Sequence, residues 1–289
     1  MQEMTLKDIQ SVSLDILKDV HDFCMKHQIN YSLTYGTLLG GVRHHGFIPW
    51  DDDVDIMMPR PDFDRFFELY HKEGKYKAAA PGENYMTIGR IYDSERTVIR
   101  TKIPWLDKEC GVWIDIFPID GVASNLKEHE ANVKIMYSNY RKQLHRRRLV
   151  LPYSQLSWNY RWKKFLTSIG LHETLQSVLD KHLSMMQKYD FDHATYCSLL
   201  ALPRNAVKVY FPKEVYNTFT DIEFEGEKFR TIKDYDILLS QIYGDYMQLP
   251  PKEEQVPDQF RYIKFYWKEQ ETAKQIDNNE QLLSSKPVA

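Results

Sequence analysis

Four aspartates crowd the segment IPWDDDVDIMMP, residues 48–59, immediately before a run of apolar residues. They are Asp51, Asp52, Asp53 and Asp55. Carboxylates at this spacing repel one another unless a cation or a solvated loop relieves the repulsion. If the residues around them form a strand, Asp53 and Asp55 project from the same side of it. Two such carboxylates can share a divalent cation, and ligands that are all oxygen favour Mg²⁺.

A calcium loop and a metal-free acidic turn are the two alternatives. In an EF-hand loop that begins at Asp51, the sixth residue is glycine and the twelfth is usually glutamate. Here these positions hold Ile56 and Asp62, which excludes the EF-hand. A solvated acidic turn needs no metal, but this one continues directly into an apolar strand.

The segment YGTLLGGVRHHG, residues 35–46, precedes the aspartates. Its glycines fit no dinucleotide fingerprint, and Val42 and Arg43 occupy the Lys and Ser/Thr positions of a P-loop. What remains is a strand, then Gly36 and Thr37, then a helix start, whose N–H groups and hydroxyl can bind a phosphate. Taken alone, the segment is better explained as a packing turn between a strand and a helix.

Asp115 stands inside the apolar segment VWIDIF, residues 112–117. An aspartate there is costly unless it is paired or binds a metal. An edge strand that faces water is the alternative. Asp120, near the end of the same strand, is interpreted as a turn residue. A Gly-Thr turn, two aspartates on the next strand and a carboxylate from a later strand form the layout of the nucleotidyltransferase fold.

Apolar spacing and turn signals predict the elements that would position these groups. We expect an α+β class with a mixed sheet, in which residues 1–123 form the catalytic core. Thr5 and Asp8 form a capping pair at the start of the first helix. The expected helices span 5–27 and 60–72, with a short helix or turn at 37–46, and the expected strands span 31–35, 54–58, 85–92, 97–102 and 111–120.

After this core the pattern becomes helical. Helices expected at 124–148 and 158–190 are interpreted as parts of an α-helical insertion over 124–200. Residues 201–268 return to short strands and a helix at 234–243, and we assign them to the catalytic domain. The polar segment 269–289 is expected to be a flexible tail.

Composition limits the class of protein. The 289 residues carry a net charge of −3, which does not favour nucleic-acid binding. Cys24, Cys110 and Cys197 form no CxxC pair, so a reduced, cytoplasmic setting is expected. The N-terminus lacks the features of a signal peptide, and no run approaches the about 18 apolar residues of a membrane span.

A dense basic patch, YRKQLHRRRL, occupies residues 140–149, and the aromatic and basic segment SWNYRWKKFLTSIGL follows it. Residues 140–165 are a candidate for peripheral contact with anionic lipid, on the inner face of the cell membrane, or with a lipid-linked acceptor. A solvated helix face is the default alternative.

Three separated blocks of this chain together resemble the LicD family of phosphocholine transferases and, more distantly, the fukutin-related phosphosugar transferases. The blocks are YGTLLGGVRHHGFIPWDDDVDIMMPRPDF, WIDIFPID and YGDYMQLPP, and the resemblance covers about residues 5–120 and 205–255. It implies a nucleotidyltransferase-like core that transfers phosphocholine from CDP-choline to a sugar hydroxyl and releases CMP. The acceptor it implies is a cell-surface glycan precursor, or lipid-linked oligosaccharide, of teichoic acid or lipopolysaccharide type.

The resemblance also implies roles for the acidic residues. By position in the family motif, Asp53 and Asp55 hold Mg²⁺, or Mn²⁺ in its place, against the diphosphate of the donor. Asp51 helps directly or through water. Asp115 is the expected third ligand and a candidate base for the acceptor proton.

Five further residues are expected to contact the donor. Gly36 and Thr37 would bind phosphate, with Arg43 as a fixed cation. Arg100 and Lys102 lie two apart on an expected strand and so share a face, from which they could neutralise the diphosphate. Solvated surface charges explain these last two at least as well.

Two other functions remain open. A nucleotidyltransferase would use the same fold but release pyrophosphate from a nucleoside triphosphate, and a CDP-alditol phosphotransferase would change only the donor. A non-catalytic glycan-binding domain is disfavoured, because Asp53, Asp55 and Asp115 are all present.

Overall fold

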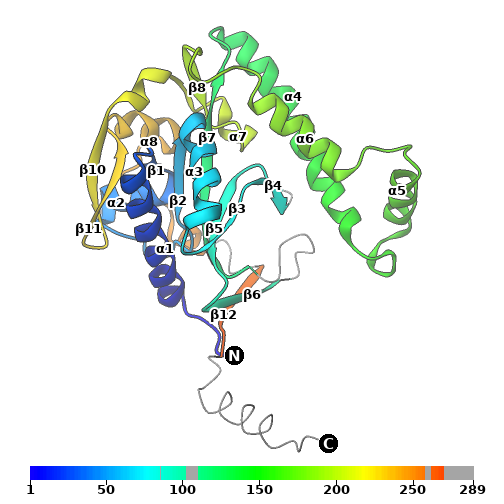
Figure 1. Cartoon of the computed structure of the whole chain (residues 1–289), viewed down its shortest axis with the longest axis horizontal. Coiled ribbons are helices and arrows are strands. Elements are labelled where there is room, and N and C mark those ends of the chain that lie inside the picture. The colour runs from blue at the N-terminus through cyan, green and yellow to red at the C-terminus, as the bar shows by residue number, and fades with distance from the viewer. Residues whose placement is uncertain (85, 102–109, 258–261, 270–289) are drawn as a thin grey trace, which may run out of the picture.

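The chain folds around one mixed β-sheet, shown in a computed structural model that describes residues 1–84, 86–101, 110–257 and 262–269 (Figure 1). The main strand order is β1-β2-β7-β5-β3, in which β2 and β7 are parallel and the other pairs are antiparallel. The expected α+β class is therefore confirmed. The strands are β1 (Ser32–Leu33), β2 (Asp55–Pro59), β3 (Lys77–Ala79), β5 (Gly89–Asp93) and β7 (Val112–Val122).

Two helices cover one face of this sheet. α1 (Leu6–His27) begins at Thr5, whose side chain forms the expected capping box with Asp8. α3 (Arg60–Glu73) follows β2 directly. The two helices contact each other through aromatic rings of Phe23 on α1 and Phe66 and Tyr70 on α3, and both contact β7. The buried rings thus fix β2 and β7 against the helical layer.

The strand register brings three charged residues into one row. Asp55 on β2 is opposite Asp115 on β7, and Asp115 is opposite Arg90 on β5. Residues directly opposite on paired strands project from the same face and lie within contact distance. β7 lies inside the sheet, between β2 and β5, so an edge position for Asp115 is excluded.

Asp120 is not a turn residue, contrary to its interpretation from sequence. β7 continues to Val122, and the Asp120 side chain is buried. Its Oδ1 accepts a hydrogen bond of 2.7 Å from Nε of Arg60, the first residue of α3. The pair lies at the opposite end of the β2–β7 ladder from Asp55 and Asp115. Burial raises the pKa of Asp120 to about 6, because the Arg60 charge offsets only part of the lost hydration.

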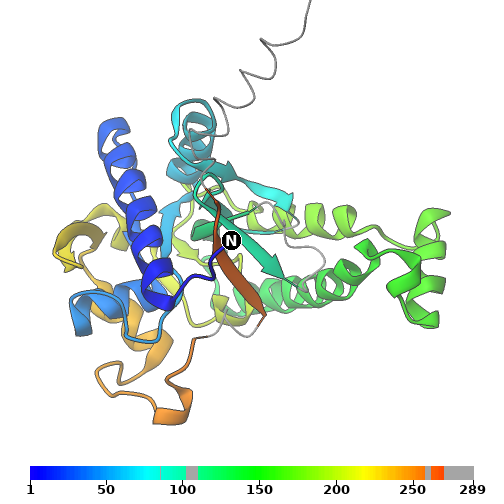
Figure 2. The same cartoon turned by 90° about the horizontal axis from the view of Figure 1, so that it is seen from below.

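The helical region forms an arm that projects from the sheet, as two views show (Figures 1 and 2). α4 (Leu126–Arg147) and α6 (Leu175–Met186) pack together along the arm, and α5 (Trp158–Ser168) lies at its outer end. The expected continuous helix over 158–190 is wrong, because the chain turns at Gly170, which has a φ of +78°. The single-turn helices η1 (Arg148–Val150) and η2 (Tyr153–Gln155) connect α4 to α5.

The rest of the chain returns to the core. β8 (Tyr196–Ser198), which the sequence assigned to the insertion, pairs with the end of β7 and with β9 (Tyr210–Pro212). β10 (Phe219–Phe224) and β11 (Glu227–Ile232) form a hairpin, and β12 (Ile263–Trp267) pairs with β6 (Thr97–Thr101) near the N-terminus. The remaining elements are β4 (Pro81–Asn84), α2 (Tyr35–His44), α7 (Pro203–Ala206), η3 (Lys213–Asn217), α8 (Tyr235–Tyr243) and η4 (Lys252–Glu254).

Within the described ranges, no helix has both the length and the apolar character needed to cross a bilayer.

The Arg60–Asp120 pair yields a first prediction. Asp120→Asn leaves the largely buried Arg60 guanidinium without its charged partner, and breaking such a pair destabilises a fold by about 3 kcal/mol. Urea unfolding measures the loss. Asp64→Asn is the matched control, because Asp64 is an exposed partner of the same Arg60 side chain and its removal is expected to cost less than about 0.5 kcal/mol. Equal losses in the two variants would contradict the assignment.

Candidate active site

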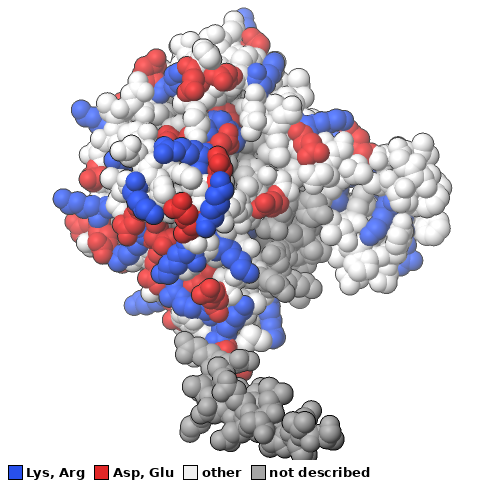
Figure 3. Space-filling model, viewed as in Figure 1, with Lys and Arg blue, Asp and Glu red and all other residues white. Residues whose placement is uncertain are grey.

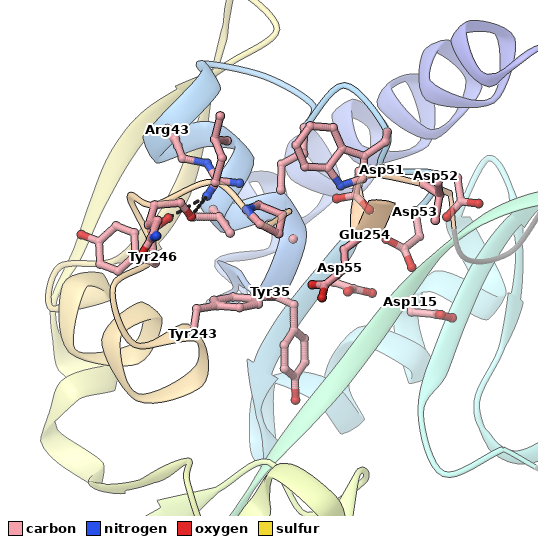
Figure 4. A pocket seen from close by; sticks show the side chains of 18 of the residues that line it. Tyr35, Arg43, Asp51, Asp52, Asp53, Asp55, Asp115, Tyr243, Tyr246 and Glu254 are labelled. Carbon is pink, nitrogen blue, oxygen red and sulfur yellow. Dashed lines mark hydrogen bonds between the residues drawn. The ribbon is translucent and has the colours of Figure 1, made fainter. Parts of the chain in front are cut away.

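A cavity of about 910 Å³ lies where α2, the aspartate segment and β7 meet the C-terminal segment 243–256 (Figure 4). Its lining is strongly acidic on one side and carries aromatic and backbone groups on the other. The residues predicted from sequence that line it are Gly36, Arg43, Asp51, Asp53, Asp55 and Asp115.

Three consecutive aspartates form the tightest carboxylate group in the described part of the chain. One oxygen each from Asp51, Asp52 and Asp53 lies within 4.8 Å of the others. Asp52 was left out of the predicted ligands, although its place in the DDD run was a signal that could have included it. A set of carboxylate oxygens at this separation matches the donors that Mg²⁺ and Mn²⁺ take in proteins. The residues present therefore fit a divalent cation.

The segment that carries these aspartates is held from both sides. The Asp51 carbonyl accepts a hydrogen bond of 2.9 Å from Nε2 of Gln10 on α1, and its N–H donates to the Ile48 carbonyl at 2.8 Å. Gly36 lies against the Asp51 carboxylate, because a Cβ at Gly36 would meet Asp51 Oδ2 at 2.5 Å. Glycine at position 36 therefore makes room for the carboxylate.

The Thr37 hydroxyl, which was predicted to bind phosphate, forms a hydrogen bond within the protein. Its side chain is buried, and Oγ1 accepts a hydrogen bond of 2.8 Å from the backbone N–H of Asp55. This bond ties the first turn of α2 to the first residue of β2. α2 begins at Tyr35, two residues before the expected start, so that Gly36 and Thr37 both lie in its first turn. Tyr35 has a φ of +45° at this junction.

Burial and mutual repulsion keep the carboxylates from ionising freely. Burial, followed by repulsion from Asp53 and a hydrogen bond to its side chain, raises the pKa of Asp51 to about 9. Burial and the charges of Asp53, Asp115 and Asp51 raise the pKa of Asp55 well above its usual value. A site in which several buried acids share one face favours protons or a cation.

Arg90 is a site residue that the sequence analysis missed. It is buried, and its Nε donates to Asp115 Oδ1 at 2.8 Å while its Nη2 donates to Oδ2 at 3.3 Å. Trp113 Nε1 donates to the same Oδ2 at 3.4 Å, and the Arg90 guanidinium lies 4.2 Å from the Trp113 ring centroid. Asp115 is therefore oriented by two donors. The sequence around Arg90, GRIY, has no feature that predicts a role in the site. Its partner Asp115 lies 25 residues away in the chain.

Arg43 holds the C-terminal wall of the cavity. Its Nη1 donates to the carbonyls of Tyr246 at 2.7 Å and Gln248 at 3.3 Å (Figure 4). These carbonyls belong to the segment YGDYMQLPP, and Arg43 belongs to the segment YGTLLGGVRHHG. The Arg43 side chain therefore connects two of the blocks that resemble the LicD family. The same segment brings Tyr243 and Glu254 to the cavity, and Figure 4 shows Glu254 among the aspartates.

The other predicted donor-contacting residues lie elsewhere. Arg100 is exposed on β6, and its guanidinium lies 5.2 Å from the Tyr266 ring centroid. Its pairing with β12 makes it part of the two-stranded sheet near the N-terminus. Lys102 falls outside the described residues.

Comparison with known proteins fits this geometry. The chain is 34% identical over 272 residues to the lipopolysaccharide cholinephosphotransferase LicD of Haemophilus influenzae. The aligned region covers 89% of this chain and 97% of the relative. The chain belongs to the LicD family. The family model for the LicD/FKTN/FKRP nucleotidyltransferase domain matches residues 28–165, and these include every predicted metal ligand.

Shorter matches involve uncharacterised proteins from two Rickettsia species. One, from Rickettsia typhi, is 44% identical over 54 residues, and one from Rickettsia prowazekii is 49% identical over 47 residues. They cover 19% and 16% of this LicD-family chain and 18% of each relative, so they add no functional argument.

The raised pKa of Asp51 predicts a pH-dependent stability of the metal-free protein. The folded-state pKa of about 9 lies above the about 4 of an unfolded aspartate, so the folded state binds more protons between these values. Stability therefore falls as the pH rises through this window. Asp51→Asn removes the effect, and its gain in Tm over the unmodified chain should increase from pH 5 to pH 8.

Thermal unfolding in EDTA measures this gain. The exposed Asp64 provides the control, since Asp64→Asn removes a carboxylate that is not part of the acidic cavity. A gain from Asp51→Asn that is the same at pH 5 and pH 8 would contradict the assigned repulsion.

Proposed function

We propose that this chain transfers phosphocholine from CDP-choline to a sugar hydroxyl of a lipopolysaccharide-type glycan precursor and releases CMP. The observation that carries the proposal is the similarity to a lipopolysaccharide cholinephosphotransferase, which extends over 97% of the length of that relative. The acidic cavity supports it, because its carboxylates fit a divalent cation and such a cation would neutralise charge during transfer of a phosphoryl group. Three free, buried cysteines are in keeping with a cytoplasmic setting.

Asp51, Asp52 and Asp53 are the residues that would hold Mg²⁺ or Mn²⁺, and the other two predicted ligands, Asp55 and Asp115, line the same cavity. When bound, such an ion neutralises diphosphate charge and makes a nearby hydroxyl easier to deprotonate. The chain contributes the fixed positions of these oxygens. Gly36 leaves space for the Asp51 carboxylate, and Thr37 holds the N–H of Asp55.

Asp115 is proposed as the group that orients the acceptor side of the reaction. Both of its oxygens accept hydrogen bonds from Arg90 or Trp113, so its direction is set before substrate arrives. Preorganised groups avoid the cost of reorientation during reaction. Arg90 acts through Asp115 and is a positioning residue.

Aromatic rings supply a proposed place for the choline head. Tyr35, Trp50, Phe117 and Tyr243 line the same cavity as the aspartates. A quaternary ammonium group is attracted to the faces of such rings and to nearby carboxylates. The volume of about 910 Å³ lies within the range of pockets that enclose small ligands.

Calorimetric titration tests the donor. We expect CDP-choline to bind in the presence of Mg²⁺, and CDP-ribitol, CTP and UDP-N-acetylgalactosamine to bind at least about tenfold more weakly. Preference for CDP-ribitol would assign an alditol phosphate donor. Preference for CTP, with release of pyrophosphate on turnover, would assign a nucleotidyltransferase. Absence of binding by all four would contradict a CDP-linked donor.

Asp53→Asn tests the carboxylate cluster. Removing one carboxylate that would hold the cation should lower kcat by about a hundredfold or more, because the cation would neutralise charge in the transition state. Release of CMP from CDP-choline in the presence of a glycan acceptor measures turnover, and circular dichroism checks the fold. Asp64→Asn, on the exposed side of α3, should retain normal turnover. Near-normal turnover of Asp53→Asn would overturn the metal assignment.

A further inference from the structure

The outer end of the helical arm, residues 144–171, is here named the arm tip. Within it, α5 directs its apolar face outward. Trp158, Trp162, Phe165 and Ile169 follow one another at steps of four, three and four residues, which places them on one helical face. Their exposed fractions are 78%, 55%, 44% and 51%. All of α5 lies within the described residues, and none of its side chains is buried.

The exposure of this apolar face differs from that in an ordinary surface helix. Such a helix buries its apolar stripe and exposes its polar face. Leu144, Val150, Tyr153 and Leu171 are exposed apolar side chains in the same arm tip. A large, contiguous apolar surface on a protein exterior marks an interaction site.

The segment that carries this surface is basic, although Glu173 follows it directly and pairs with Lys142 at 3.9 Å. Residues 131–172 contain nine Lys and Arg and no Asp or Glu, in a chain whose net charge is −3. The outer end of the arm is accordingly white with scattered blue on the face shown in Figure 3. Apolar and cationic surfaces therefore coincide at one place that projects from the core.

The arm tip is held as a unit. Lys164 Nζ donates to the Leu151 carbonyl at 2.6 Å, and Arg161 Nε donates to the Leu156 carbonyl at 2.9 Å. Both contacts tie α5 to the connection that precedes it. The Trp162 and Phe165 rings lie 5.5 Å apart between centroids, so the exposed rings form a continuous surface.

We propose that the arm tip docks on an anionic membrane surface, with α5 lying in the plane of the interface. Trp158, Trp162 and Phe165 would enter the boundary between headgroups and acyl chains, where tryptophan is favoured and where an amphipathic helix gains from apolar burial. The exposed cation Lys163 of the arm tip and the exposed Arg141 on the preceding part of α4 would meet the anionic headgroups.

Charge favours lipid over a second copy of this chain. Two arm tips that met face to face would place like charges together, which opposes association. An anionic bilayer supplies both the apolar medium and the opposite charge. The inference does not rest on the transfer reaction, because binding to vesicles without sugar or nucleotide is measured separately.

Vesicle flotation with the full chain tests the proposal. We expect binding to vesicles of phosphatidylglycerol and phosphatidylcholine, weaker binding at high salt, and no binding to phosphatidylcholine alone. The double variant Trp158→Ser, Trp162→Ser should lower the partition coefficient by roughly tenfold or more. The matched control Leu126→Ser, Ile135→Ser removes two exposed apolar side chains from α4 and should bind like the unmodified chain.

A charge variant keeps the test independent of the aromatic residues. Arg141→Gln with Lys163→Gln removes two exposed cations and should weaken binding by roughly tenfold or more, since each cation is attracted to an anionic surface. Circular dichroism checks that each variant is folded. Equal binding to both vesicle types, or full binding by either the tryptophan variant or the charge variant, would overturn the proposal. Self-association through the arm tip without vesicle binding would also overturn it.

Discussion

Repulsion among carboxylates at one end of the β2–β7 ladder is the constraint on which the rest of this structure depends. Asp51, Asp53, Asp55 and Asp115 face one cavity, and burial raises the cost of ionising them together. Neutral residues at these positions would make the folded protein more stable. The surrounding contacts hold the acids in place despite this cost, and the proposed cation would relieve it.

The supporting contacts come from elements far apart in the chain. Arg90 on β5 orients Asp115, Thr37 on α2 holds the N–H of Asp55, and Arg43 fastens the C-terminal segment across the cavity. The sheet register makes the first of these possible, because Arg90, Asp115 and Asp55 occupy one row across three strands. At the opposite end of the ladder, Asp120 forms an ion pair with Arg60. This structural ion pair therefore lies apart from the acidic cavity.

The arm presents the opposite surface chemistry. Where the cavity concentrates acids, residues 131–172 carry only basic charge together with exposed rings. In the proposed function the acidic cavity holds the donor, and in the proposed docking the arm lies at an anionic interface. The two regions lie on different elements, so variants of one can be tested without changing the other.

The sequence by itself determined the groups whose meaning is local. Capping at Thr5 predicted the start of α1, and the DDDVD run predicted an acidic cluster, because neighbours in the chain remain neighbours in the fold. Only the tertiary structure decided the partners of Arg90 and Asp120 and the outward direction of α5. These depend on strand register and on which helical face meets the core, and both are set by pairing between residues distant in sequence.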